Sequence, residues 1–202
     1  MKLYFSPGAC SLSPHIALRE AGIAFDLVPA NMKTHTLADG TDFYGINSKG
    51  YVPLLELDDG ERLSEGAAIV QYIADQAPES HLAPANGTMA RYRLQEWLNF
   101  ITSEIHKGFS PLFNPAMPAE AKTLAKDKLA DRFKWLDSKL EGRSYLMGDT
   151  FSVADAYLFT TANWSKHVGL DISSLANLAA FLGRVAARPA VQAAMRAEGL
   201  LK

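Results

Sequence analysis

Residues 2–18 read KLYFSPGACSLSPHIAL, and the fold class of the first domain follows from them. A short β-strand is predicted for residues 2–5, and the Ser-Pro-Gly that follows is a turn signal. A serine N-cap followed by a proline in the first turn is typical of a helix start, so we expect a helix from Ser11 or Ser13 to Gly22. A strand that passes directly into a helix indicates a mixed α/β domain.

The next sixty residues complete this first domain. Further strands are predicted at residues 25–28, 53–57 and 61–63, and the polar, glycine-containing stretch 31–49 is predicted to be mostly loop. A helix is predicted at residues 65–76, because apolar side chains recur on one face. The order is therefore β-α-β, a long connection, and then β-β-α.

The rest of the chain is predicted to be helical. Proline and small polar residues mark a linker at residues 79–86. Five helices are predicted beyond it, at residues 89–109, 120–140, 153–167, 175–187 and 191–197. We therefore expect an α/β domain at residues 1–78, the linker, and an all-helical domain at residues 87–202.

Composition excludes several classes of protein. The formal net charge of −2 gives no field that would attract nucleic acid or anionic lipid. No apolar stretch reaches the roughly 18 residues of a membrane span, and the N-terminus lacks the apolar run of a signal peptide. The single cysteine forms no internal disulfide. These features favour a cytoplasmic protein that binds neither nucleic acid nor membrane.

Cys10 is the first candidate for chemistry, because it lies at the entrance of the predicted helix. Unpaired N–H groups and the helix dipole lower the pKa of a thiol there, and would equally stabilise the thiolate of a bound substrate. The alternative is a small buried apolar residue. The C-x-x-S pattern excludes a dithiol cycle but not a monothiol one. The histidines show no metal-ligand spacing, so no metal is expected.

Three further features have both a functional and a structural interpretation. The segment Ser64-Glu65-Gly66 opens a helix, either as an anion site or as an ordinary cap. Asn99, Ser103, His106 and Lys107 lie at i, i+4, i+7 and i+8 of one helix, which makes either a binding stripe or a solvated face. Ser152 to Asp155 matches a capping-box variant, for which we predict a structural role.

The complete chain resembles a glutathione transferase, specifically one of the bacterial beta class. The resemblance is carried by an ordered set of segments at residues 1–4, 6–15, 52–53, 65–72, 96–100, 104–108 and 153–159. It implies a thioredoxin-like first domain followed by a helical bundle, in a homodimer. It also implies that glutathione is the cosubstrate.

The resemblance further implies roles for individual residues. Pro53 should be cis, so that the Val52 backbone faces the cysteinyl part of glutathione, and Glu65 should bind the γ-glutamyl ammonium. His35 stands where the family often has a lysine that contacts the glycyl carboxylate; either Lys33 replaces that lysine or His35 is protonated. The implied catalytic residues are Cys10, Ser11 and His106. The implied glutathione-binding residues are Ala9, Cys10, His35, Tyr51, Val52, Pro53, Glu65, Gly66, Asn99, Ser103, Glu104, His106 and Lys107. Candidate walls for a hydrophobic substrate are Phe109, Phe113 and Trp164.

The implied reaction is attack by the glutathione thiolate on a hydrophobic electrophile, a detoxification. Stabilisation of the thiolate is expected from backbone N–H groups, from Ser11 or Cys10, and from the positive field of His106 and Lys107. Two alternatives stay open. One is glutathione-dependent thiol-disulfide or peroxidase chemistry at Cys10, and the other is a non-catalytic glutathione- or ligand-binding protein on the same fold.

Overall fold

A computed structural model describes residues 1–201 and divides the chain into two compact units. The first unit contains residues 1–83 together with residues 188–201, and the second contains Pro84–Ala187. The boundary after residue 83 falls inside the predicted linker. Lys202, the last residue of the predicted helical domain, lies outside the described residues.

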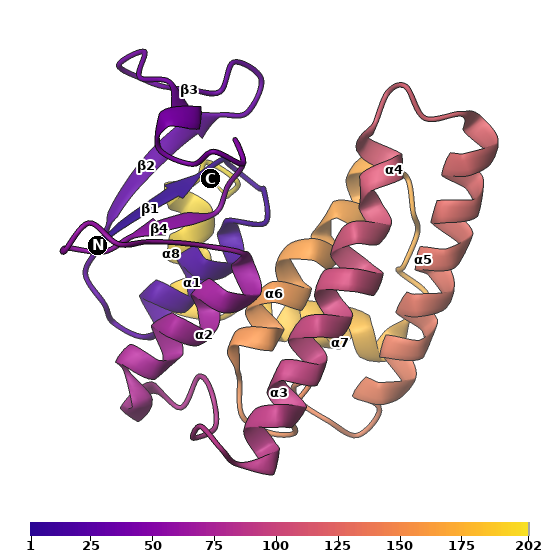
Figure 1. Cartoon of the computed structure of the whole chain (residues 1–202). Helices are drawn as coiled ribbons and strands as arrows, with labels where there is room; N and C mark the ends of the chain where they lie inside the picture. The colour runs from indigo at the N-terminus through magenta and orange to yellow at the C-terminus, as the bar shows by residue number, and fades with distance from the viewer. Residues whose placement is uncertain (202) are drawn as a thin grey trace. The chain divides into compact units, whose positions relative to one another are not determined.

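The first unit is built on a five-stranded mixed sheet with the order β3-β2-β1-β4-β5 (Figure 1). β1 pairs in parallel with β2 and antiparallel with β4, and the two outer pairs are antiparallel. The strands are β1 (Lys2–Phe5), β2 (Asp26–Asn31), β3 (Thr36–Leu37), β4 (Leu54–Glu56) and β5 (Arg62–Ser64), and the helices of this part are α1 (Leu12–Glu20) and α2 (Gly66–Gln76). The predicted order of these elements is confirmed, with β3 in addition.

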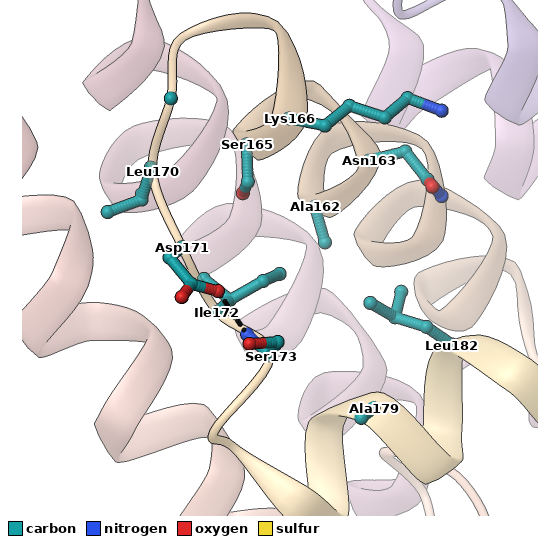
Figure 2. Close-up of a pocket in the computed structure, with 11 residues that line it drawn as sticks. Ala162, Asn163, Ser165, Lys166, Leu170, Asp171, Ile172, Ser173, Ala179 and Leu182 are labelled. Carbon is teal, nitrogen blue, oxygen red and sulfur yellow. Dashed lines mark hydrogen bonds between the residues drawn. The ribbon is translucent and has the colours of Figure 1, made fainter.

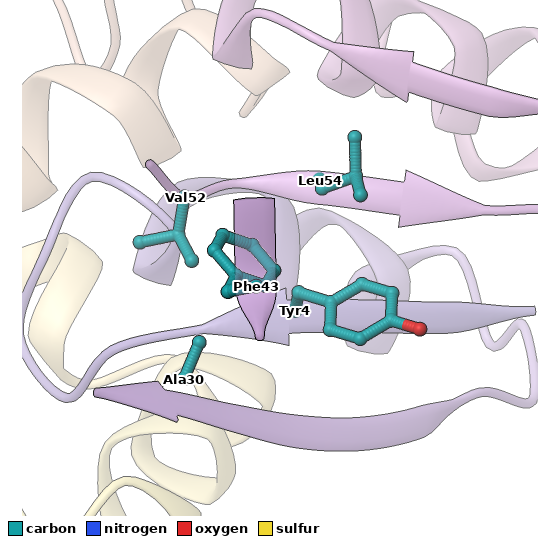
Figure 3. Packing of buried hydrophobic residues seen from close by; sticks show 5 residues of the cluster. All are labelled: Tyr4, Ala30, Phe43, Val52 and Leu54. Carbon is teal, nitrogen blue, oxygen red and sulfur yellow. The ribbon is translucent and has the colours of Figure 1, made fainter. Parts of the chain in front are cut away.

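Alternation along the strands gives the sheet two apolar faces. Tyr4 and Leu54 are opposite each other in the register and point to one face, where Ala30, Phe43 and Val52 complete a cluster (Figure 3). Leu3 and Leu55, the next pair in the register, therefore point to the other face, and both are fully buried. A sheet buried on both faces holds its loops in fixed positions.

The stretch 31–49, predicted to be mostly loop, is more ordered than expected. It contains β3 and a 3-10 turn at Phe43–Gly45, and the Asp42 side chain caps this turn by accepting from the Tyr44 N–H. Phe43 is completely buried, with its ring 5.7 Å from that of Tyr4. A single aromatic residue that enters the core fixes this connection, and such a contact leaves no periodic pattern in the sequence.

The C-terminal segment corrects the predicted domain boundary. We assigned residues 87–202 to the helical domain, but helix α8 (Pro189–Ala197) packs on α1 of the first unit, and the two helices lie side by side in Figure 1. Arg188 donates two hydrogen bonds to the Glu20 carboxylate, of 2.6 and 2.7 Å. Glu198 pairs with His15 at 2.8 Å. These polar contacts at both ends of α8 select α1 as its partner.

The second unit is helical, as predicted. Its α-helices are α3 (Met89–Phe100), α4 (Ser110–Phe113), α5 (Ala119–Leu140), α6 (Val153–Ala162) and α7 (Ala176–Ala186), with 3-10 turns at Lys107–Phe109 and Asn163–His167. All ten residues of α6 are buried, and α6 packs against α3 and α7. Among residues 1–201, no helix is long and apolar enough to cross a membrane.

The helix predicted at residues 89–109 is interrupted. A π-helical segment occupies Ile101–His106, between α3 and the 3-10 turn at Lys107–Phe109. A π-turn pairs residue i with i+5 and is wider than an α-turn, so side chains beyond it no longer follow the 3.6-residue period. The predicted stripe from Asn99 to Lys107 assumed that period; Asn99, Ser103 and Lys107 are all exposed, whereas His106 is partly buried.

Helix α6 begins with a buried carboxylate that accepts three hydrogen bonds. The Asp155 carboxylate accepts from the N–H of Leu146 at 2.8 Å and from the N–H and Oγ of Ser152 at 2.7 and 2.8 Å. Asp155 has no exposed surface. The predicted capping box is confirmed, and it also holds the loop before α6.

We expect Asp155→Ala to destabilise the protein by about 2–4 kcal/mol, because two buried N–H groups lose their acceptor together with the helix cap. Ser152→Ala removes only the hydroxyl contact and should cost about 1 kcal/mol. Denaturant unfolding of both variants measures the difference. Equal losses would show that the Asp155 carboxylate does not hold the Leu146 loop.

Candidate functional site

Cys10 lies in the turn between β1 and α1, directly before the helix. Its Sγ is 3.4 Å from the backbone oxygen of Val52, and its side chain is half-buried. Because a carbonyl oxygen can only accept, the thiol donates its proton to Val52 and is therefore in its neutral form. The structure thus brings together Cys10 and Val52, two residues that the resemblance assigns to one site.

The predicted lowering of the Cys10 pKa is wrong. Burial raises the pKa of this thiol to about 11, and the negative charge of Glu65 acts in the same direction. The backbone N–H groups of Cys10 and Ser11 act in the opposite direction but do not compensate. A thiol with this pKa is a hydrogen-bond donor at neutral pH rather than a nucleophile.

Ser11 uses its hydroxyl inside the same turn. Its Oγ accepts from the N–H of Ser6 and donates to the oxygen of Ser6, both at 3.2 Å, and its side chain is fully buried. Ala9 closes the turn with a backbone bond to the Ser6 oxygen at 3.0 Å. The single hydroxyl proton of Ser11 is therefore already committed. In this structure Ser11 shapes the turn rather than pointing a donor out of it.

The Val52–Pro53 peptide bond is cis, which confirms the implied conformation. Pro53 lies next to the start of α2, since a β-carbon placed on Gly66 would be 3.8 Å from its Cγ. That distance is an ordinary contact, so the site has room for a larger residue at Gly66. The Val52 backbone and the N-terminus of α2 are thus neighbours.

Glu65 precedes α2 with a φ of 71°, a conformation that non-glycine residues rarely adopt. Its Oε1 accepts from Lys49 Nζ at 2.6 Å and from the Tyr51 hydroxyl at 3.1 Å. Unusual backbone conformations of this kind concentrate at functional sites. Glu65 and Tyr51, both candidates from the sequence, are in direct contact.

Lys49 is the site residue that sequence reasoning missed. It donates to Glu65 and, at 3.0 Å, to Ser64 Oγ, so it spans the two residues before α2. Sixteen positions separate Lys49 from Glu65. No periodicity or motif connects them, and only the packing of the 31–49 connection brings them together. Lys33, the other candidate cation, is exposed on the same connection.

His35 is fixed by contacts with residues 44 and 50, at the end of the connection between β2 and β4. Its Nδ1 is 2.8 Å from the oxygen of Gly50, and its ring lies 4.6 Å from that of Tyr44. The Gly50 carbonyl can only accept, so the proton is on Nδ1 and only Nε2 remains to meet a ligand. Gly50 has a φ of 70°, and a β-carbon there would lie 2.2 Å from the Tyr44 ring, so the stack requires glycine.

In the second unit, His106 joins the three aromatic residues predicted to line a hydrophobic site. The rings of Phe109, Phe113 and Trp164 are 5.6 to 6.0 Å apart, and His106 lies 5.0 Å from Trp164. Phe109 is fully buried, whereas Phe113 is 49% exposed. The Nδ1 atom of His106 is 2.6 Å from the hydroxyl of Tyr157, a contact the sequence did not suggest.

The other polar candidates of this unit point in different directions. Glu104 turns to α5, where Arg132 at 2.8 Å and Lys128 at 3.4 Å lower the pKa of its carboxyl. Ser103 donates to the oxygen of Asn99 at 2.9 Å. Asn99, Ser103 and Lys107 are exposed. Glu104 and His106 are two positions apart on the helix, so their side chains point in different directions.

A pocket of about 470 Å³ also lies in the second unit, between the end of α6, the following loop and α7 (Figure 2). None of the predicted site residues lines it. The lining surface is mainly apolar and includes Leu170, Ile172 and Leu182. The buried Ser165 hydroxyl has no hydrogen-bond partner among the described residues. Within residues 1–201, no group of three or more acidic, histidine or cysteine side chains could hold a metal ion.

A mixed sheet of this order, with a cis-proline opposite a thiol at the start of a helix, defines a thioredoxin-like domain, and a helical unit follows it. The family models of the glutathione S-transferase N-terminal and C-terminal domains match residues 8–76 and 100–189. The chain belongs to the glutathione S-transferase family and is a glutathione transferase.

Individual relatives agree over the whole length. The chain is 45% identical to glutathione S-transferase GstA of Escherichia coli O157:H7 over 200 residues, which cover 99% of this chain and 100% of the relative. It is similar to a ternary complex of BphK, a bacterial GST, with 57% identity, a TM-score of 0.97, and 99% and 100% coverage. It is also similar to the beta-class enzyme of Sphingomonas chungbukensis, with 51% identity, a TM-score of 0.96 and complete coverage of both chains.

We expect Cys10 to be unreactive in the folded protein. With a pKa of about 11, only roughly one thiol in ten thousand is ionised at pH 7. Alkylation by iodoacetamide should therefore be slow at pH 7 and should rise steadily with pH to beyond pH 10. The denatured chain is the matched control, and it should react roughly two orders of magnitude faster at pH 7. Equal rates in both states would contradict the assignment.

Proposed function

We propose that this glutathione transferase joins the glutathione thiol to hydrophobic electrophiles, as a detoxification reaction in the cytoplasm. The contact between the Cys10 thiol and the Val52 oxygen carries the proposal. A neutral Cys10 can donate a hydrogen bond to a neighbouring thiolate, whereas it is a poor attacking group itself. The nucleophile is then the sulfur of glutathione.

The first unit offers complementary groups for each part of glutathione. The Val52 oxygen has two lone pairs. One accepts from the Cys10 thiol, and the other can accept from the cysteinyl N–H of glutathione. The Glu65 carboxylate, between Lys49 and Tyr51, would bind the γ-glutamyl ammonium. The N–H groups at the start of α2, around Gly66, would bind the neighbouring carboxylate.

Several implied roles stay predictions. They concern Asn99, Ser103, Glu104, His106 and Lys107 as glutathione ligands, and Phe109, Phe113 and Trp164 as contacts of the electrophile. The mutual contacts of the three aromatic rings and His106 support the second group. A homodimer is likewise proposed from the family resemblance.

The variant Cys10→Ala separates conjugation from disulfide chemistry. If Cys10 is only a donor beside the glutathione sulfur, conjugation to a chloronitroaromatic substrate should be largely retained. Glutathione-dependent reduction of a mixed disulfide, which needs the Cys10 sulfur, should vanish. Both rates are measured on the same preparation, with Cys10→Ser as the control that keeps a donor.

Loss of conjugation in Cys10→Ala would contradict the proposal that glutathione supplies the nucleophile. Disulfide reduction by the unmodified chain that is lost together with conjugation would favour thiol-disulfide chemistry at Cys10. Glutathione affinity without turnover on any of several electrophiles would instead support a binding protein.

We also propose that His35 meets the glycyl carboxylate of glutathione only when its ring is protonated. With Nδ1 bonded to Gly50, a neutral ring presents the Nε2 lone pair, which repels a carboxylate. A side chain with a permanent positive charge should therefore bind this carboxylate more tightly, so His35→Lys should lower the KM for glutathione at pH 7 severalfold.

The control for this prediction changes the ligand rather than the protein. Glutathione amidated at its glycyl carboxyl lacks the negative charge, so its KM should be the same in the unmodified chain and in His35→Lys. An unchanged KM for glutathione itself in His35→Lys would exclude a contact through His35. Lys33 would then be the next candidate.

A further inference from the structure

Glu198, which follows α8, reaches the turn that carries Cys10. Its Oε2 accepts from the N–H of Gly8 at 2.9 Å, and its Oε1 is 2.8 Å from Nδ1 of His15 in α1. The side chains of Glu198 and His15 have no exposed surface. A buried carboxylate therefore uses one oxygen for the turn and the other for the helix.

The proton positions in this cluster follow from Arg19. Its Nε donates to Nε2 of His15 at 2.8 Å, and a guanidinium can only donate. Nε2 is therefore the acceptor, and the ring is neutral with its proton on Nδ1, which donates to Glu198. The rings of Phe5 and Phe25 lie 6.4 and 5.5 Å from that of His15 and fix its orientation.

Gly8 is the position in the turn that depends on this support. It has a φ of 71°, and a β-carbon there would lie 3.4 Å from the Leu200 side chain, beyond Glu198. Ser11 braces the turn from within, through Ser6. Through a hydrogen bond, Glu198 connects the turn to the C-terminal segment, 190 positions away along the chain.

We propose that Glu198 is a positioning residue for the transferase reaction. Its contact with Gly8 fixes the position of the turn, and its contact with His15 fixes the position of α1. Together these contacts place Cys10 and the nearby backbone N–H groups beside the glutathione sulfur. This inference rests on the proposed role of that turn beside glutathione. The C-terminal segment, assigned by the sequence to the helical domain, is then a part of the glutathione half of the enzyme.

The variant Glu198→Gln tests the proposal while keeping the side-chain size. In the variant an NH2 group replaces one of the two carboxylate oxygens, so either the Gly8 N–H or His15 Nδ1–H faces a donor instead of an acceptor. The imidazole cannot adapt by transferring its proton to Nε2, because Nε2 accepts from Arg19. We expect kcat/KM for conjugation to fall by about tenfold or more. The titration of the bound glutathione thiol, followed by its thiolate absorbance, should move to higher pH.

A second substitution should restore the activity. In Glu198→Gln with Arg19→Gln, the oxygen of the new Gln side chain in α1 can accept from Nε2 of His15. The imidazole proton then moves to Nε2, and Nδ1 accepts from the amide of the other glutamine. The double variant should recover most of the lost kcat/KM, and Arg19→Gln alone should change it little.

Arg188→Ala is the matched control, because it removes the other polar anchor of α8, on Glu20, and does not touch the turn. It should lower the melting temperature without changing kcat/KM or the thiol titration. Amide exchange of residues 6–12 should increase in Glu198→Ala and stay unchanged in Arg188→Ala.

Three results would each overturn the inference: unchanged kinetics in Glu198→Gln, an equal kinetic loss in Arg188→Ala, or no recovery in the double variant. Failure of the proposed function would be visible separately. In that case the unmodified chain itself would not conjugate glutathione, whatever Glu198 does.

Discussion

Hydrogen-bond partners from distant parts of the chain hold the turn between β1 and α1 in place. The turn takes the chain from a central strand into a buried helix within six residues, of which Ser11 is buried and four others are partly buried. Buried N–H groups without partners are costly, and here the partners come from distant parts of the chain. Val52 supplies an acceptor for Cys10, and Glu198 supplies one for Gly8.

The same burial decides the chemistry of Cys10. A charge at a helix N-terminus gains about 0.3–1 kcal/mol from the dipole. The pKa increase from 9.0 to about 11 corresponds to roughly 3 kcal/mol against the thiolate. Desolvation therefore outweighs the favourable helix end. The position of Cys10 in the sequence indicated the helix dipole but not the extent of burial, so the predicted direction of the pKa change was wrong.

Sequence reasoning succeeded where local patterns determine structure. Turn residues, caps and apolar periodicity predicted most strands and helices, the capping box at Asp155 among them. It failed where contacts between segments that are distant in the sequence determine the local structure or the packing. The π-helical turn at Ile101–His106 was not predicted, and the apolar face of α8 did not reveal that the helix packs on α1 of the first unit. Lys49 reaches Glu65 only because the 31–49 connection folds back.

Two histidines of the first unit show how partners decide what a residue can do. His15 and His35 both carry a proton on Nδ1, which one donates to a carboxylate and the other to a carbonyl oxygen. Arg19 occupies Nε2 of His15 with a donor, so that ring cannot take a second proton without losing the contact. No described residue donates to Nε2 of His35, which leaves that nitrogen available to a ligand. The buried ring of His15 is therefore structural, while the ring of His35 on the 31–49 connection can contact a ligand.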